Sequence, residues 1–164
     1  MVSQRSSKLV IIKSTQKDVK VAPPKPLTTG TYVTMVSTRF KLTTKQAMQV
    51  AQSLFELGLI TYHRTDSPVM SPDCVEQIRA FAAANRLPLP QTPRVYKASD
   101  AAQEGHECLR VVDINQANVL LGKPIEEAVY HAIWEITISS QLDDAIDKQT
   151  QVVWANSANA LFLS

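Results

Sequence analysis

Tyr62 and Arg64 lie two residues apart within residues 60–67, ITYHRTDS, and these residue types suit phosphoryl transfer. A free phenol, with a pKa of about 10, is mostly protonated at neutral pH and is a poor nucleophile. A neighbouring guanidinium favours the phenolate and also binds the phosphate under attack. The pair therefore indicates a tyrosine nucleophile with an arginine partner, although a buried tyrosine beside an exposed arginine fits the same pattern without any chemistry.

The residues around Tyr62 favour an extended backbone, because Ile60–Thr65 is mainly β-branched or aromatic and is too short for a helix of its own. Side chains alternate along an extended chain, so Tyr62, Arg64 and Asp66 are predicted to share one side. Asp66 is then placed to orient Arg64, and an ordinary turn role explains this aspartate equally well.

A helix is predicted to lead into this segment. Thr43 and Gln46 have the spacing of a capping box, and apolar residues recur at helical spacing as far as Leu54. Gly58 supplies the left-handed residue that favours a helix end. The predicted helix therefore ends just before Ile60.

Two more helices are predicted further along the chain. Ser71, Pro72 and Asp73 are typical of a helix start, with the serine as cap, the proline in the first turn and the aspartate at the positive end of the dipole. This helix is predicted to run to about Asn85. Pro124 opens the longest helical pattern in the chain.

Short strands are predicted at both ends of the sequence. Lys8–Lys13 is one, and Val19–Val21 is interpreted as its hairpin partner before the proline-rich residues 23–26. Gln151–Trp154 and Ala160–Leu163 are predicted to form a second hairpin. Unpaired strand edges at both ends favour aggregation unless the ends pair with each other, and this arrangement is typical of a piece of a longer protein.

Composition sets broad limits on the fold and on the partners. The 164 residues, 45% of them hydrophobic, suffice for one compact domain, and a net charge of +2 allows only a local nucleic-acid-binding patch. No apolar run approaches the roughly 20 residues that cross a bilayer. Cys74 and Cys108 lie far apart without metal-site spacing, so two reduced thiols in a cytosolic protein are expected.

The tyrosine segment resembles a known motif. Residues 54–67, LFELGLITYHRTDS, are similar to the active-site tyrosine motif of type IA DNA topoisomerases, the topoisomerase I and III family. The resemblance includes PLTT at 26–29, AMQVAQ at 47–52 and AQEGHECLR at 102–110, in the order of that family. It covers roughly residues 20–164.

The resemblance implies a specific reaction. Tyr62 would attack a backbone phosphorus of single-stranded DNA, form a 5′-phosphotyrosine intermediate and allow strand passage and religation without ATP. Arg64 would clamp the scissile phosphate, while His106 and Arg110 would contact DNA phosphates. Three further residues are candidates for supporting roles: Gln103, Glu104 and Asp66.

The loop that contains His106 leaves two points open. Glu104 and Glu107 either tether Arg64 or Arg110, or are solvated loop acids. The family's usual Ala-Ile-Arg-Pro is replaced here by CLRV at 108–111. His63 after the tyrosine and HEC at 106–108 are more similar to the topoisomerase half of reverse gyrases.

The resemblance also implies the fold, α+β and truncated. Residues 1–27 would be strand segments of an arch domain and a proline-rich linker, and residues 149–164 its returning strands. Residues 28–148 would be a mainly helical tyrosine domain with a winged-helix-like subdomain. Thr28–Phe40 is rich in β-branched residues and leans to strand by propensity, but it is assigned as helix on the resemblance.

The resemblance places Mg²⁺ elsewhere in the full-length enzyme, on the Asp-x-Asp pair of a toprim domain. Here the nearest acidic pair is Asp143-Asp144, which is adjacent, so no metal site is predicted in this chain and the chain alone is expected to be inactive. The implied partners are DNA and the rest of the topoisomerase, without a membrane, at a cytoplasmic, nucleoid-associated location.

Three other functions remain open from the sequence. The chain could be a non-catalytic module that binds single-stranded DNA with Tyr62 idle, the topoisomerase half of a reverse gyrase, or a purely structural interaction domain. Binding of DNA at low salt separates the last of these from the others, because the phosphate contribution is strongest there.

Overall fold

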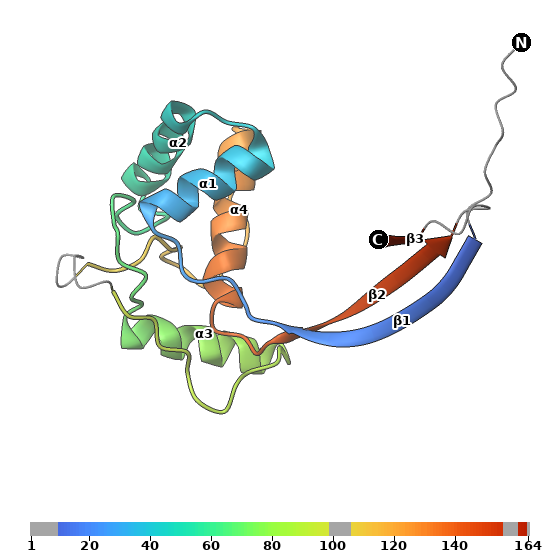
Figure 1. The fold of residues 1–164 in the computed structure, drawn as a ribbon. Helices are drawn as coiled ribbons and strands as arrows, with labels where there is room; N and C mark the ends of the chain where they lie inside the picture. Colours follow the sequence, from blue (N-terminus) through green and yellow to red (C-terminus); the bar gives the residue numbers. More distant parts are fainter. Residues whose placement is uncertain (1–9, 99–105, 156–160, 164) are drawn as a thin grey trace, which may run out of the picture. The chain divides into compact units, whose positions relative to one another are not determined.

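The computed structural model describes residues 10–98, 106–155 and 161–163, which belong to two compact units (Figure 1). The strand unit is drawn from both ends of the chain, and the helical unit is Pro23–Asp143. The division falls after residues 22 and 143, whereas the sequence placed it after residues 27 and 148. The strand that returns from the helical unit begins already at Ala145.

The strand unit is a three-stranded antiparallel sheet in the order β1-β2-β3. Strand β1 is Val10–Val21, β2 is Ala145–Ala155 and β3 is Leu161–Leu163. The predicted pairing of the two C-terminal strands is confirmed by β2 and β3. The two ends of the chain also pair with each other through β1 and β2, as the edge argument required.

The predicted hairpin within the N-terminal segment is wrong, because β1 is one continuous strand. It pairs with β2 from Val10 opposite Ala155 to Val21 opposite Ala145, with one irregularity between Ile11 and Lys13. The residues between the two predicted strands, STQKD at 14–18, include no glycine, proline or asparagine to form a tight turn. Continuing the ladder with β2 satisfies their backbone groups instead.

The described residues of the helical unit form four helices, and all four were predicted. Their bounds are α1 Thr29–Phe40, α2 Thr44–Glu56, α3 Pro72–Ala84 and α4 Pro124–Ser139. Helix α1, which the resemblance favoured against strand propensity, is confirmed. In the described part of the chain, no helix combines the length and the apolar character needed to span a bilayer.

Side-chain caps determine where α1 and α2 begin. The predicted capping box of α2 is confirmed, since the Thr43 N–H donates to Gln46 Oε1 at 2.9 Å and the Gln46 N–H donates to Thr43 Oγ1 at 3.3 Å. Thr28 caps α1 in the same way. After α2, Gly58 has a φ of 68°, the left-handed conformation that glycine adopts without strain.

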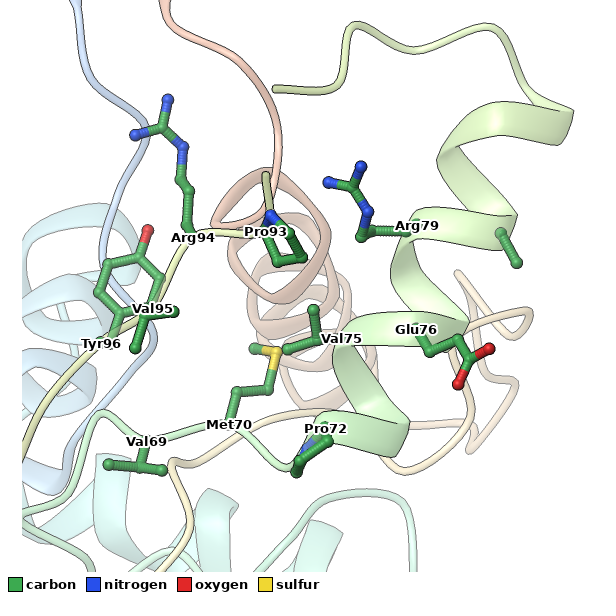
Figure 2. A pocket seen from close by; sticks show the side chains of 11 residues that line it. Val69, Met70, Pro72, Val75, Glu76, Arg79, Pro93, Arg94, Val95 and Tyr96 are labelled. Carbon is green, nitrogen blue, oxygen red and sulfur yellow. The ribbon is translucent and has the colours of Figure 1, made fainter. Parts of the chain in front are cut away.

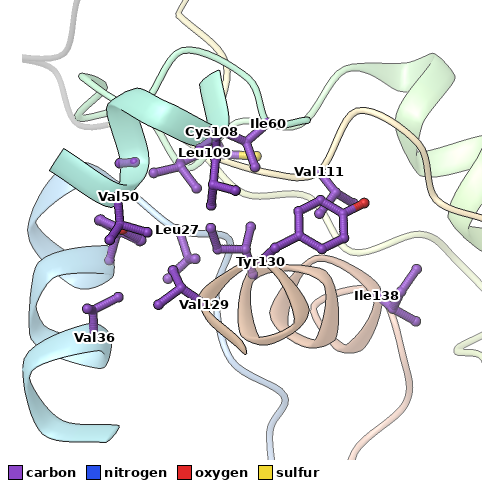
Figure 3. Packing of buried hydrophobic residues seen from close by; sticks show 14 of the residues in the cluster. Leu27, Val36, Val50, Ile60, Cys108, Leu109, Val111, Val129, Tyr130 and Ile138 are labelled. Carbon is purple, nitrogen blue, oxygen red and sulfur yellow. The ribbon is translucent and has the colours of Figure 1, made fainter. Parts of the chain in front are cut away.

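A single apolar core joins α1, α2 and α4 (Figure 3). Tyr32 of α1, Leu54 of α2 and Ile133 of α4 are all fully buried in it. Burial of each large apolar side chain of this kind contributes about 1.5–3 kcal/mol. The Tyr32 hydroxyl donates to the Ala47 carbonyl at 2.8 Å and so joins α1 directly to α2.

One irregular segment, residues 108–112, connects the core to the loops that contain Leu27, Ile60 and Val69. We call this segment the central strip. It forms isolated antiparallel bridges with Leu27 through Leu109 and with Ile60 through Val111. Cys108 adds a backbone hydrogen bond to the Val69 carbonyl at 2.7 Å. The central strip therefore ties three stretches that are distant in sequence, and residues 106 and 107 lead directly into it.

An ion pair anchors the central strip to the start of α3. Glu107 accepts from Arg110 through both carboxylate oxygens, at 2.8 and 3.0 Å, and also from the Ser71 N–H at 3.0 Å. Ser71 was predicted to cap α3 through its side chain, and this prediction is wrong because the side chain makes no capping hydrogen bond. Burial alone would raise the pKa of the Glu107 carboxyl, but the hydrogen bonds from Arg110 and Ser71 outweigh it and lower the pKa.

Glu107→Gln should lower the free energy of unfolding by about 1.5–3 kcal/mol at neutral pH, because a mostly buried charged hydrogen-bond set is lost. The folded-state pKa of Glu107 lies below its ordinary value of 4.5, so the stabilisation is present above pH 4.5 and is lost as the pH falls through the folded-state pKa. Urea unfolding at several pH values measures this difference. Glu76→Gln, which changes an exposed acid of α3, is the matched control; equal losses in both variants would contradict the anchoring role of Glu107.

Candidate active site

The segment that contains Tyr62 is extended, and its side chains alternate as predicted. Tyr62, Arg64 and Asp66 are exposed, whereas the side chains between them, His63 and Thr65, are buried. Tyr62 is 52% exposed, so its ring is accessible while remaining partly supported by its neighbours. A reacting group on this side of the segment can therefore meet both Tyr62 and Arg64.

Thr61 fixes the segment on the side of the central strip. Its N–H donates to the Arg110 carbonyl at 2.9 Å, and its hydroxyl donates to the Cys108 carbonyl at 2.8 Å. The Arg110 N–H in turn donates to the Thr61 hydroxyl at 3.0 Å. The residue directly before Tyr62 is thus held by backbone and side chain together.

Thr29, the first residue of α1, fixes the other side. Its hydroxyl donates to the His63 carbonyl at 2.8 Å and accepts from the Thr65 N–H at 2.8 Å. Its own N–H donates to the Thr65 carbonyl at 2.8 Å. Arg64 lies between these two anchored residues, so the backbone on each side of its side chain is fixed by the start of α1.

Sequence reasoning assigned no role to Thr29 or Thr61, although both belong to the motifs that support the resemblance. A threonine in an extended or helix-start position is common, and its type gives no indication of a hydrogen-bond partner tens of residues away. The only signal that could have found them was their position, one beside Tyr62 and one at the predicted start of α1.

The rings of Phe55 and His63 pack against the Tyr62 ring. The ring centroids of Phe55 and Tyr62 are 5.3 Å apart in an edge-to-face arrangement, and those of Tyr62 and His63 are 5.5 Å apart. His63 is only 1% exposed, and neither ring nitrogen has a hydrogen-bond partner among the described residues. Burial and the nearby Arg64 charge both lower the pKa of His63, so its ring is neutral at neutral pH.

Arg64 lies where two surface hollows meet. The first, of about 430 Å³, brings Arg64, Asp66 and His106 together beside the start of α1. The second, of about 400 Å³, runs along α2 and also includes Arg64. Within the described residues Arg64 forms no hydrogen bond or ion pair, so its guanidinium is available to an anion.

His106 is exposed at the rim of the first hollow, on the same side as Arg64. A phosphate in this hollow could receive hydrogen bonds from both side chains, while the Asp66 carboxylate would repel it unless Arg64 lies between them. The structure therefore groups three of the sequence-predicted residues, Arg64, Asp66 and His106, around one hollow that is large enough for a phosphate.

The role of Arg110 in DNA contact stays a prediction, and the structure shows internal hydrogen bonds of its side chain. Its guanidinium donates twice to Glu107 and once to the Val111 carbonyl at 2.9 Å, and its side chain is only 15% exposed. The tether to Glu107, one of two alternatives from the sequence, is what the structure contains. All three guanidinium nitrogens are used internally, so the geometry favours an anchoring role for Arg110. Gln103 and Glu104 lie outside the described residues.

A further pocket shares no lining residue with the two hollows around Arg64. It has a volume of about 610 Å³ between α3 and the loop at residues 93–96, and its walls are mostly apolar (Figure 2). Met70, Val75 and Val95 contribute to these walls. The Tyr96 hydroxyl donates to the Ser140 carbonyl at 2.7 Å. Tyr96 and Arg94 also lie two residues apart in this lining, but both are used internally, since the Arg94 Nε–H donates to the Leu142 carbonyl at 2.7 Å.

The described residues around Tyr62 supply no cluster of metal-ligand side chains. Among the described residues, no three histidine, cysteine, aspartate or glutamate side chains converge to hold a metal ion. The two cysteines are buried free thiols, and burial raises the pKa of Cys108 to about 12. The positive charge that the described residues place here comes from Arg64.

His63→Met should raise the free energy of unfolding by about 1 kcal/mol at pH 7. Removing the buried, unpaired nitrogens stabilises the folded protein by about 1–3 kcal/mol. Losing the ring contacts with Phe55 and Tyr62 destabilises it by about 0.5–1.5 kcal/mol. Because the folded-state pKa of His63 lies below 6.5, the wild type should lose further stability relative to the variant as the pH falls below 6.5. Thermal unfolding at pH 7 and pH 5.5 measures both effects, with exposed His106→Met as control. A destabilised His63→Met protein would show that His63 has a partner that stabilises it.

Comparison with known proteins gives the chain a family. The sequence model of the family described as DNA topoisomerase matches residues 1–163. DNA topoisomerase 1 of Treponema pallidum is 33% identical over 157 residues, which cover 88% of this chain and 21% of that protein. DNA topoisomerase 1 of Escherichia coli is 33% identical over 151 residues, which cover 88% of this chain and 17% of that protein.

A solved structure agrees at the level of the fold. Full-length topoisomerase I from Thermotoga maritima superposes with a TM-score of 0.67 at 22% identity, covering 98% of this chain and 27% of that one. The chain thus spans about a fifth of the length of the curated relatives named above. With a family match over nearly its whole length and a mixed helix and strand fold like that of topoisomerase I, the chain belongs to the type IA DNA topoisomerases.

Proposed function

We propose that this chain provides the nucleophile of a topoisomerase that cuts one DNA strand, passes another through the break and reseals it without ATP. The observation that supports this most directly is the geometry of Tyr62, half exposed on an anchored segment with Arg64 on the same side and without a partner among the described residues. Membership of the type IA family supplies the substrate class, DNA.

The proposed step is a transesterification. The Tyr62 oxygen attacks the phosphorus of a phosphodiester in single-stranded DNA, and the bond from phosphorus to the 3′ oxygen breaks as the new bond forms. The phenolic proton is lost, and the departing 3′ oxygen gains one, so the products are a 5′-phosphotyrosine and a free 3′-hydroxyl. One ester replaces another, and resealing by the reverse reaction therefore needs no ATP.

Arg64 and His106 are proposed to bind phosphate oxygens during this step. Arg64 can clamp the scissile phosphate and stabilise the charge that develops on it, because its guanidinium has no described internal partner. His106 faces the same hollow and can donate a hydrogen bond to the same or an adjacent phosphate. Asp66 is proposed to orient Arg64, and Glu104 and Gln103 to support this loop.

The rest of the reaction requires parts that relatives of greater length can supply. We propose that a toprim domain binds Mg²⁺ and forms the other wall of the site, and that the strand unit belongs to an arch domain. The helical unit is then the tyrosine domain with its winged-helix-like portion. Activity in the cytoplasm at the nucleoid, as part of one longer topoisomerase, follows from the same proposal.

Tyr62→Phe should abolish covalent trapping of DNA when the toprim domain and Mg²⁺ are supplied, either in one polypeptide or in trans. The phenylalanine keeps the ring contact with Phe55 but lacks the attacking oxygen. Trapping is measured as labelled oligonucleotide that remains bound to protein after denaturation. Tyr96→Phe removes a hydroxyl from the same unit and should still trap DNA.

Trapping that persists in Tyr62→Phe would overturn the proposed nucleophile. A wild-type protein that binds single-stranded DNA in a stable complex with the toprim domain, yet never becomes trapped, would identify a non-catalytic binding module instead.

A further inference from the structure

The exposed face of α2 beside Arg64 has no role in the proposed cleavage step. Lys45, Gln49, Gln52 and Glu56 recur at three- and four-residue intervals, so they lie along one stripe of the helix. They line the hollow of about 400 Å³, and Arg64 closes one side of it. From Lys45 to Gln52 the stripe rises by roughly 10 Å.

The charges along this stripe are divided between its two ends. Near the start of α2, neither Lys45 nor Gln49 forms a hydrogen bond or ion pair with another described residue, so both are available to a ligand. Near the end of α2, the Gln52 side-chain amide donates to the Glu56 carboxylate at 2.7 Å. A polyanion in this hollow would therefore be attracted towards Lys45 and repelled near Glu56.

The wall between these ends has a mixed character that suits a nucleotide. Met48 is half-buried and offers an apolar surface to a base or a sugar, and the Gln49 amide can both donate and accept hydrogen bonds. Lys45 provides a point charge for a phosphate oxygen without requiring a fixed geometry. One phosphate and one base can thus be met by neighbouring side chains of α2.

Cleavage itself determines which part of the DNA needs such a surface. After Tyr62 attacks, the part of the cut strand on the 3′ side of the break stays covalently attached through its 5′ phosphate. The other part ends in a free 3′-hydroxyl. The unit that contains Tyr62 must therefore accommodate the attached half. Arg64 lines both hollows, so nucleotides next to a phosphate bound by Arg64 are within reach of the second hollow.

We infer that the α2 face binds the nucleotides on the 3′ side of the scissile phosphate, with Lys45 contacting a backbone phosphate and Gln49 contacting a base or sugar. This inference rests on the proposed function of Tyr62. The face holds the attached strand end while the break is open, so that it can be returned to the 3′-hydroxyl.

The test uses single-stranded oligonucleotides with a fixed 5′ segment and one, two, four or eight nucleotides beyond the cleavage position, with the toprim domain and Mg²⁺ supplied. In the wild type, the fraction trapped should increase as this 3′ segment is lengthened. In the double variant Lys45→Ala and Gln49→Ala, the trapped fraction on long substrates should fall roughly fivefold, to the level of the shortest substrate. Lys45→Arg, which keeps the charge, should restore most of the loss caused by Lys45→Ala.

Salt dependence gives a second readout. Lys45→Ala should reduce the slope of log affinity against log salt concentration by roughly 0.7 for substrates with the long 3′ segment, because one phosphate contact is lost. Lys17→Ala removes one exposed positive charge from β1 and serves as the matched control, with no change in the dependence on 3′ length.

The outcomes separate the inference from the function on which it rests. If the wild type traps DNA and the double variant shows the same dependence on 3′ length, the inference about α2 is wrong while Tyr62 remains the nucleophile. If no substrate is trapped by any protein, the proposed function fails and the inference fails with it.

Discussion

The position of Tyr62 depends on two threonine hydroxyls that hold an irregular stretch of backbone. Thr61 binds the central strip on one side, and Thr29 binds the carbonyls and N–H on both sides of Arg64. An extended segment outside a sheet would otherwise leave its backbone groups to water and its side chains free to reorient. These hydrogen bonds fix the extended backbone as the ladder of a sheet would, and they leave the side with Tyr62 and Arg64 exposed to a substrate.

The supports of this segment are themselves fixed by the rest of the helical unit. The N-terminal cap of α1 sets the position of Thr29, and the ion pair of Glu107 with Arg110 holds the central strip against the start of α3. His63 is the exception, because its buried nitrogens have no partner among the described residues. Its ring packs against Tyr62, but its two nitrogens lose their hydration on burial, which destabilises the folded protein relative to one with an apolar side chain there.

Much of this arrangement could be predicted from local patterns. The capping box at Thr43, the glycine at position 58 and the alternation of side chains about Tyr62 are properties of neighbouring residues, and the structure confirms each of them. The resemblance was needed for α1, where β-branched residues favoured a strand and packing in the core overrides that preference. Its buried tyrosine and valine make that core contact.

Contacts between distant residues could not be predicted in this way. The register of β1 with a strand more than a hundred residues away, the role of Thr29 and the choice of Arg110 as the partner of Glu107 all depend on tertiary structure. An arginine in a functional motif has the same sequence signature whether it binds DNA or a nearby glutamate. The structure shows the contact with Glu107, and the contact with DNA stays a prediction.

The central claim is that one oxygen, on Tyr62, becomes joined to DNA, and mass spectrometry of the trapped adduct tests it most directly. Trypsin should release residues 46–64 as one peptide in which Tyr62 is the only tyrosine. After nuclease trimming, this peptide should have the added mass of a 5′-linked nucleotide, and fragmentation should locate that mass on Tyr62. A nucleotide found on any other residue of the chain, or linked through a 3′ phosphate, would contradict the account.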